Sequence, residues 1–281
     1  MVRRRKPTIR AVWLGQALRE IRDEAGLSSK DAGAHLGCDA SSIIRIEAGE
    51  MPVTSERLDL WLEMCGVSDP RRRSDLFTIR KDVGQTGWWD GYRADVAPLL
   101  MDRAWMESKA HAIRTVELTY LPGLLQTPEY AEALMRAWHP EVPDSGVESW
   151  VALRMNRQQI LSKHRPIRFT TIISEHLLGS RTGGAKAMRV QLDRLLELSE
   201  RPNIEVHVLP LGVTTGLGGS FEVFGLAKPY PEVAYAVIPA GDICLEGEPV
   251  EQLSEAYDRL LGAALDPAAS RHLIIAERDK L

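Results

Sequence analysis

The chain of 281 residues is long enough for two domains of modest size. Its apolar content of 44% and charged content of 26% are typical of a soluble globular protein and exclude a disordered or fibrous chain. No apolar run approaches the roughly 20 residues that a membrane-spanning helix needs, and no signal-peptide core follows the basic N-terminus, so we expect a cytoplasmic protein with no membrane partner.

The net charge of −4 is divided unevenly along the chain. Residues 1–83 contain 15 Lys and Arg and 13 Asp and Glu, a net charge of +2, whereas residues 84–281 contain 20 and 26, a net charge of −6. This division favours a DNA-binding head joined to an acidic body that does not bind DNA. A head charge of +2 would by itself be weak evidence for DNA binding.

Residues 1–10 are predicted to form a basic arm. It contains four consecutive cations, Arg3, Arg4, Arg5 and Lys6. Such a run can lie on DNA phosphates or reach into a minor groove. A solvated tail is an equally good interpretation of the same four residues.

Residues 11–83 are predicted to form a helical domain, whose centre is a pair of short helices around a tight turn. Ser28 or Ser29 can cap the first of them, because a hydroxyl accepts hydrogen bonds from the free N–H groups of a first helical turn. Asp39 can cap the second, which is predicted to cover residues 40–47. This is the plan of a helix-turn-helix, in which the second helix enters the major groove, although an ordinary helical hairpin in a core gives a similar pattern.

The second helix is predicted to place its polar side chains outward. Ala40, Ser41 and Arg45 then face the base edges of the DNA. Arg45 is shaped for a bidentate contact with guanine, and Ala40 can pack on a thymine methyl group. Ser29 and Ser42 are candidates for phosphate contacts, helped by the helix N-termini.

Three more helices complete the predicted head: one over residues 12–25, one after residue 54 and one that begins at Pro70. Gly33 suits a point where two helix backbones cross closely. Residues 13–67 resemble the five-helix DNA-binding domain of XRE-type repressors, although Ala32 stands where that family usually has Leu. The matching residues are Leu14, Gly15, Leu18, Arg19, Ala25, Gly26, Leu27, Ser28, Leu36, Gly37, Ser42, Ile43, Ile44, Arg45, Ile46, Glu47, Ala48 and Gly49.

Residues 84–92, with the sequence GQTGWWDGY, break the helical pattern and predict a linker between the head and the body. The three aromatic side chains Trp88, Trp89 and Tyr92 favour a linker that docks on the second domain over a free tether. An aromatic cage for a ligand is an alternative.

Residues 93–281 predict a second domain of mixed secondary structure. Helices are expected at residues 98–117, 128–138, 148–164, 185–200, 250–264 and 267–278, and strands at residues 167–173, 204–209, 220–226, 233–238 and 243–246. The stretch 167–209 predicts a parallel crossover, and the later strands predict antiparallel hairpins. In the helix at 148–164, Arg154, Arg157 and Lys163 are expected to point outward. The fold class is α+β: an all-α five-helix helix-turn-helix head followed by a mixed α/β domain with a small sheet packed by helices.

The second domain contains four distinctive stretches: YLPGLLQTPEYAEALMRA, RPNIEVHVLP, GGSFEVFG and YDRLLGAALDPAASRHLI. They resemble the C-terminal domain of an actinomycete family of antitoxin-like, or WhiJ-like, transcriptional regulators, and the similarity runs from about Trp88 to the end of the chain. The sequence departs from that family's pattern at three positions. Val116 stands where the family has an aromatic residue, Leu118 where it has Pro, and Ser174 where it has Asp. The resemblance implies a dimerisation or regulatory module, in regulators whose genes often lie beside one for a small partner protein.

The sequence contains no pattern typical of a catalytic or metal site. The Gly-rich stretch 212–219 lacks the Lys-Ser/Thr of a P-loop and is predicted to form a hairpin loop. Cys38, Cys65 and Cys244 are far apart, without a CxxC pair, and are predicted to be reduced thiols rather than zinc ligands. We therefore expect no enzyme, no metal and no cofactor.

The expected function is that of a sequence-specific transcriptional regulator. It would bind double-stranded DNA at an inverted-repeat operator as a homodimer, and a signal or a partner protein through its C-terminal domain. Two alternatives remain open: a small-molecule-sensing regulator, and a protein–protein adaptor whose helical head does not bind DNA. The modest charge of the head favours the adaptor. The strands of the second domain have apolar faces but no set of converging polar side chains, so the sequence does not decide whether this domain senses a small molecule.

Overall fold

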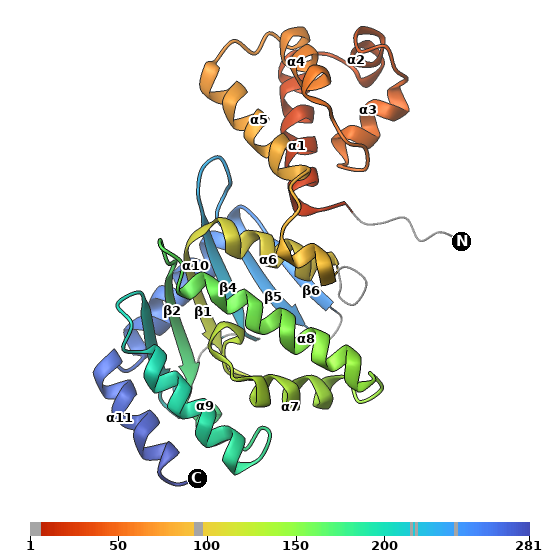
Figure 1. Ribbon diagram of the computed structural model, residues 1–281. Helices are drawn as coiled ribbons and strands as arrows, with labels where there is room; N and C mark the ends of the chain where they lie inside the picture. The colour runs from red at the N-terminus through yellow and green to blue at the C-terminus, as the bar shows by residue number, and fades with distance from the viewer. Residues whose placement is uncertain (1–6, 93–97, 214–215, 217–218, 239–240) are drawn as a thin grey trace. The chain divides into compact units, whose positions relative to one another are not determined.

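The computed structural model of the chain describes residues 7–92, 98–213, 216, 219–238 and 241–281. The chain divides into two compact units, one built mainly from residues up to Asp90 and the other mainly from Arg103–Leu281. Figure 1 shows the first unit, the head, as five helices in red and orange, and the second unit, the body, as a sheet with helices. The α+β class expected from the sequence is confirmed. No helix within the described ranges is long and apolar enough to cross a membrane.

The helices of the head each begin where a polar side chain can cap them. They are α1 (Ile9–Glu24), α2 (Ser29–His35), α3 (Ala40–Glu47), α4 (Ser55–Met64) and α5 (Pro70–Val83). The caps, each of which accepts a hydrogen bond from a backbone N–H of the first turn, are Thr8, Ser28, Asp39, Thr54 and Asp69. The predicted bounds of α3 are confirmed, because Asp39 fixes its first turn.

Large apolar side chains from three helices form the core of the head. Leu18 and Ile21 of α1, Ile43 of α3, and Leu58 and Trp61 of α4 are almost completely buried. Burial of each such side chain contributes about 1.5–3 kcal/mol. The indole N–H of Trp61 donates to the carbonyl oxygen of Leu18 at 3.2 Å, so the packing of α4 on α1 leaves no unpaired donor on this ring.

The prediction of a basic arm that extends to residue 10 is wrong at its last two positions. Helix α1 begins at Ile9, because the side chain of Thr8 accepts a hydrogen bond from the N–H of Ala11. Ile9 and Arg10 are buried, and the guanidinium of Arg10 donates to the carbonyl oxygen of Asp82 at 2.8 Å. The predicted DNA-binding residues of the arm, Arg3, Arg4 and Arg5, lie outside the described residues.

A six-stranded mixed sheet forms the centre of the body, in the order β3-β2-β1-β4-β5-β6. The strands are β1 (Ala110–Glu117), β2 (Arg168–Ser174), β3 (Ile204–Leu209), β4 (Phe221–Leu226), β5 (Val233–Ile238) and β6 (Gly241–Leu245). β1, β2 and β3 run parallel, whereas β4 is antiparallel to β1, β5 to β4 and β6 to β5. The predicted parallel crossover and the predicted antiparallel order of the later strands are confirmed.

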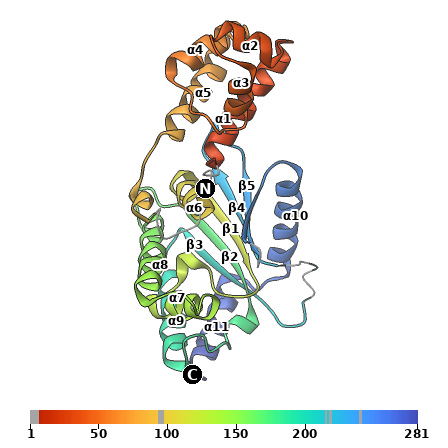
Figure 2. The ribbon, with the colours of Figure 1, turned by 90° about the vertical axis from the view of Figure 1, so that its right-hand side faces the viewer.

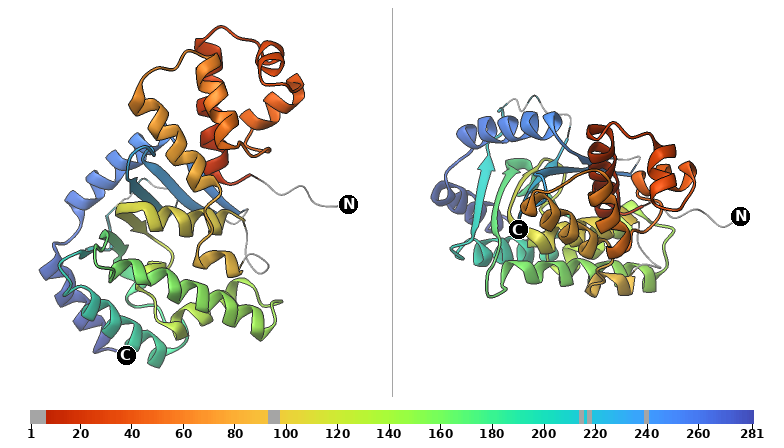
Figure 3. Two further views of the ribbon diagram at one scale, coloured as in Figure 1. Left: turned by 45° about the horizontal axis from the view of Figure 1, so that its top comes forward. Right: turned by 90° about the horizontal axis from the view of Figure 1, so that it is seen from above.

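Helices cover both faces of this sheet. They are α6 (Pro98–Lys109), α7 (Pro128–Trp138), α8 (Asp144–Arg157), α9 (Ala185–Leu198), α10 (Glu248–Ala263) and α11 (Pro267–Arg278). Figure 2 shows α10 on one side of the sheet and α6 and α8 on the other, and Figure 3 shows the same layers from above. Under α10 the packing is apolar, with Val116, Val223 and Ala234 of the sheet against Tyr257 and Leu260.

The central strand β1 contradicts the prediction of a helix over residues 98–117. Helix α6 ends at Lys109 and the chain continues directly as β1, hydrogen-bonded between β2 and β4. The β-branched residues Ile113, Thr115 and Val116 favour a strand, and all three are buried. No Gly, Pro or Asn turn residue separates α6 from β1, so the sequence does not mark where the helix ends and the strand begins.

Two further predictions for the body are corrected. The stretch 212–219 is not the loop of a hairpin, because β3 and β4 on either side of it are separated in the sheet by β2 and β1; residues 214, 215, 217 and 218 lie outside the described part. The helix predicted at 148–164 begins earlier, at Asp144, and ends at Arg157, where a 3-10 turn at Gln158–Leu161 follows.

The predicted linker contains a short 3-10 helix, Trp88–Tyr92. It begins where the N–H of Gly87 donates to the carboxylate of Asp90 at 2.6 Å. At its end, the hydroxyl of Tyr92 accepts a hydrogen bond from the side chain of Asn156 in α8 at 2.7 Å. Tyr92 is therefore attached to the body.

Candidate nucleic-acid interface

A buried ion pair holds the candidate recognition helix α3 on α1. The Nε of Arg22 lies 2.5 Å from one carboxylate oxygen of Glu47, and its Nη2 lies 3.0 Å from the other. Only 9% and 7% of these side chains are exposed. Arg22 also donates to the carbonyl oxygen of Leu27 at 2.6 Å. The bidentate pair fixes the C-terminal end of α3 on α1.

Two glycines allow the backbones around α3 to approach closely. A Cβ atom on Gly15 would lie 2.3 Å from the carbonyl oxygen of Glu47, so α1 and α3 cross at this point. A Cβ atom on Gly33 would lie 2.6 Å from the carbonyl oxygen of Cys38. The close backbone approach predicted at Gly33 is confirmed, but the backbone that approaches it is the turn before α3 and not a second helix. The two helices that cross closely are α1 and α3, and they cross at Gly15.

The outer face of α3 presents most of the predicted base-reading residues to solvent. Ile43 and Ile46 are buried, as predicted, whereas Ser41 and Arg45 are exposed and Ala40 is half-buried. Sequence reasoning missed Ile44, which is 57% exposed. An isoleucine this exposed on a short helix is a candidate for an apolar contact with DNA. Its position next to Arg45 in the second helix is the sequence feature that could have indicated this role.

Arg45 is held only loosely in the free chain. Its Nε lies 3.6 Å from a carboxylate oxygen of Glu50, and 45% and 38% of the two side chains are exposed. An exposed pair at this distance contributes little to stability. The guanidinium of Arg45 can therefore exchange Glu50 for another acceptor at small cost.

Carboxylates occupy the N-terminal ends of α2 and α3, where phosphate contacts were predicted for Ser29 and Ser42. Asp31 accepts a hydrogen bond from the N–H of Ser28 at 3.1 Å, and Asp39 accepts one from the N–H of Ser42 at 2.7 Å. Hydrogen bonds from Ser28 lower the pKa of Asp31, and hydrogen bonds from Ser42 lower the pKa of Asp39. Both carboxylates are thus ionised at neutral pH, and their charge weakens the attraction of these two helix ends for phosphate.

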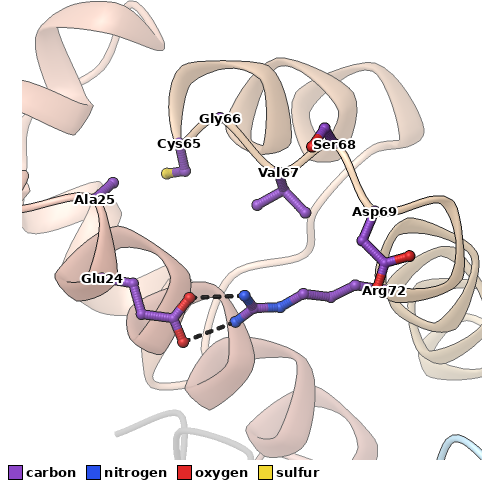
Figure 4. Close-up of a pocket in the computed structure, with 8 residues that line it drawn as sticks. All are labelled: Glu24, Ala25, Cys65, Gly66, Val67, Ser68, Asp69 and Arg72. Atoms are coloured by element: carbon purple, nitrogen blue, oxygen red, sulfur yellow. Dashed lines mark hydrogen bonds and ion pairs between the residues drawn. The ribbon is translucent and has the colours of Figure 1, made fainter.

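A cavity of about 340 Å³ lies at the end of α1, beside the turn between α4 and α5. Figure 4 shows Arg72 reaching across it to Glu24, with hydrogen bonds of 2.7 and 3.0 Å. Arg73 is paired with Asp59. Two members of the Arg71–Arg73 run are therefore engaged with carboxylates of the head itself, which does not favour this run as a phosphate-binding surface.

The described part of the chain contains no group of three or more His, Cys, Asp or Glu side chains that could hold a metal ion. Cys38, Cys65 and Cys244, which all lie in the described part of the chain, form no disulfide. Burial raises the pKa of the Cys65 thiol above its ordinary value, so this thiol is protonated at neutral pH.

Comparison with known proteins assigns both units. Residues 13–74 match a helix-turn-helix domain, which supports an XRE-like DNA-binding regulator. Residues 100–276 match a domain of unknown function, DUF5753. Comparison with curated proteins and with solved structures gave no significant match. The match to the second domain spans more than half of the 281 residues, and the chain therefore belongs to the DUF5753 family, with a helix-turn-helix domain in front of it.

Proposed function

We propose that the chain is a sequence-specific transcriptional regulator of the XRE type, which inserts α3 into the major groove of DNA. The observation that carries this proposal is the combination of a rigidly held α3 with an exposed outer face. Arg22 and Glu47 fix the end of the helix, while Ser41, Ile44 and Arg45 project from it. A surface of this kind meets base edges when the helix enters the groove.

The side chains of α3 suit different base contacts. The guanidinium of Arg45 can donate to O6 and N7 of one guanine, and Ser41 can donate to or accept from a base edge. Ala40 and the exposed Ile44 can pack on thymine methyl groups. Ser29 and Ser42 remain candidates for phosphate contacts, which position the helix without reading sequence.

Replacement of Arg45 by alanine should weaken binding to the preferred operator by about 1–3 kcal/mol, because a bidentate contact with one guanine is lost. Binding to random duplex should change less. Fluorescence anisotropy with both duplexes measures the two affinities. Arg19→Ala is the matched control, since it removes the same charge from the exposed surface of α1. An equal loss on both duplexes would remove Arg45 from the base-reading residues.

The basic residues Arg3, Arg4 and Arg5 are proposed to bind phosphate outside the contacts of α3. Each phosphate that they neutralise should add about 0.9 to the slope of log affinity against log salt concentration. Deletion of residues 1–6, which leaves the Thr8 cap of α1 in place, should flatten that slope. An unchanged slope would show that the arm does not contact DNA.

The chain is further proposed to act as a homodimer on an inverted repeat, as an antitoxin-like (WhiJ-like) regulator. One helix of eight residues reads few base pairs, and helix-turn-helix proteins of this plan pair two heads about one DNA turn apart. Light scattering of the free chain and of its DNA complex should give two chains per complex. One chain per operator in the complex would contradict the proposal.

The body is proposed to bind a small protein encoded beside this gene and to have no catalytic activity. Its support is the resemblance of the body to WhiJ-like regulators. Such a partner changes DNA binding only if it has different affinities for the free and the DNA-bound chain. Calorimetric titration of the full chain with the neighbouring gene product, with and without operator, measures both affinities; absence of binding in both titrations would refute this part of the proposal.

A further inference from the structure

The connection between α7 and α8 gathers four aromatic rings at one end of this helical hairpin. Trp138 is the last residue of α7 and His139 follows it, while Trp150 lies in α8 and Tyr120 lies beyond the end of β1. Figure 1 shows α7 and α8 side by side, with the connection between them at the right of the body. These four residues are called the aromatic patch below.

The rings of the aromatic patch contact one another in two edge-to-face pairs. The ring centres of Tyr120 and Trp138 are 4.9 Å apart, and the planes of the two rings are inclined by 71°. The ring centres of His139 and Trp150 are 5.0 Å apart, with an inclination of 77°. This geometry is one of the favoured arrangements of aromatic rings. Because Trp138 and His139 are consecutive residues, the two pairs form one connected group.

The aromatic patch is open to solvent. Trp138 is 42% exposed, and the side chain of His139 is 47% exposed. Tyr120 and Trp150 are half-buried, whereas Trp105 in the core of the body is completely buried. Tryptophan and tyrosine are the residues most enriched at binding hot spots, because one stiff ring supplies a large contact area. Exposed rings that are grouped in this way are typical of an interaction surface.

Carboxylates lie beside the aromatic patch. Residues 128–150 contain five Asp and Glu, one Arg and no Lys, which gives a net charge of −4. Glu141 and Asp144 follow His139 in the chain, and their side chains are 69% and 79% exposed. A carboxylate oxygen of Glu141 lies 3.3 Å from Nδ1 of His139. The hairpin therefore places negative charge directly next to the exposed rings.

The single arginine of this stretch does not neutralise that charge. Arg136 donates to Asp144 at 2.7 Å and to Glu132 at 3.0 Å, so two carboxylates share one guanidinium group. Among the described residues, the ion-pair partner of Glu141 is His139. A neutral imidazole leaves the charge of this carboxylate uncompensated. The surface thus keeps an excess of negative charge.

This combination of rings and carboxylates suits a guanidinium group. The face of a tryptophan or tyrosine ring attracts a cation, and a carboxylate accepts charge-assisted hydrogen bonds from arginine. The body already contains the first kind of contact twice, between Arg103 and Tyr235 at 5.0 Å and between Arg114 and Tyr257 at 5.4 Å. A nucleic acid does not suit the same surface, because the carboxylates repel its phosphates.

We propose, on the basis of the partner-binding role proposed above for the body, that the aromatic patch and Glu141 form the docking surface for an arginine-rich segment of a partner protein. One arginine of the segment stacks on the indole of Trp138, and a neighbouring arginine pairs with Glu141. The surface is separate from α3, so its test requires no DNA.

A fluorescein-labelled tetra-arginine peptide is the probe, and tetra-citrulline, which has nearly the same shape without the charge, is its counterpart. Fluorescence anisotropy is measured as the full chain is titrated into each peptide. The wild-type chain should bind tetra-arginine saturably and should not bind tetra-citrulline. Trp138→Ala should weaken binding of tetra-arginine at least about threefold, because it removes a cation–π contact. Trp138→Phe keeps a ring and should recover most of the affinity. The midpoint of thermal unfolding shows that each variant is folded.

A pair of charge variants separates this surface from the overall acidity of the body. Glu141→Gln should weaken binding about twofold, as expected for one exposed ion pair. Glu255→Gln removes the same charge from the exposed surface of α10, and it should bind tetra-arginine as the wild type does. Because Glu141 is itself exposed, its variant keeps the proposal testable if Trp138→Ala fails to fold.

Three results would overturn the proposal: equal binding of the two peptides, equal binding by the wild type and Trp138→Ala, and equal losses in Glu141→Gln and Glu255→Gln. The titration with the neighbouring gene product is a separate experiment. If that protein does not bind the full chain while tetra-arginine binds as expected, the identity of the partner is wrong and the docking surface is supported.

Discussion

Replacement of Arg157 by methionine is expected to lower the free energy of unfolding of the body by about 3–5 kcal/mol. Arg157 and Glu107 are 2% and 1% exposed, and the substitution leaves the Glu107 carboxylate buried without its bidentate partner. Hydrogen exchange followed by mass spectrometry gives the result for each unit separately. Peptides from α6 and α8 should exchange at least about 100-fold faster, because each 1.4 kcal/mol corresponds to a factor of ten.

The double variant Arg157→Met with Glu107→Leu tests the cause of this loss. Replacement of both charges by apolar side chains of similar volume removes the unpaired carboxylate, so most of the stability should return. Arg136→Met, which removes an exposed charge of α7, should leave exchange in α6 and α8 unchanged. A double variant as unstable as the single one would show that the stability came from packing of the Arg157 stem and not from the charge pair.

Replacement of Glu47 by alanine is expected to lower the free energy of unfolding of the head by about 3 kcal/mol. The substitution leaves Arg22, of which 9% is exposed, without its two carboxylate bonds, and it releases the end of α3 from α1. Peptides from α1 and α4 should exchange roughly 150-fold faster, whereas peptides from the sheet of the body should not change. Operator binding should fall as well, because the recognition helix is no longer held in one position.

Glu63→Ala is the control for this prediction, since Glu63 is an exposed residue of α4. It should change neither the exchange of the head nor operator binding. Unchanged exchange in Glu47→Ala would mean that the ion pair does not hold α3. Unchanged operator binding in spite of faster exchange would mean that the position of α3 does not limit DNA recognition.

The helices of the head were predictable because their signals are local. Asp39 caps α3 and Pro70 begins α5 within one turn of the residues that they organise, and the buried Ile43 and Ile46 follow the helical period. The Arg22–Glu47 pair was not predicted, because its members are 25 residues apart and no local pattern connects them.

The body shows where local reasoning fails. The local sequence of strand β1 predicts the end of a helix, because the pairing with β2 and β4 that makes it a strand involves residues far along the chain. The expectation that Arg157 points outward is wrong, since Glu107, 50 residues away, neutralises it in the interior. Arg154, expected to point outward in the same way, is only partly exposed and is bound to Gln126. A charged side chain on a helix is usually a surface residue, and only the tertiary structure supplies the buried partner that makes an exception.

Selection of bound sequences from a random duplex library with the full chain shows whether α3 reads DNA sequence. We expect enrichment of an inverted repeat with half-site centres about one turn, roughly 10 base pairs, apart. Selection with Arg45→Ala should lose the preference for guanine at one position of each half-site and keep the rest. A bound pool with the same composition as the input library would contradict the claim.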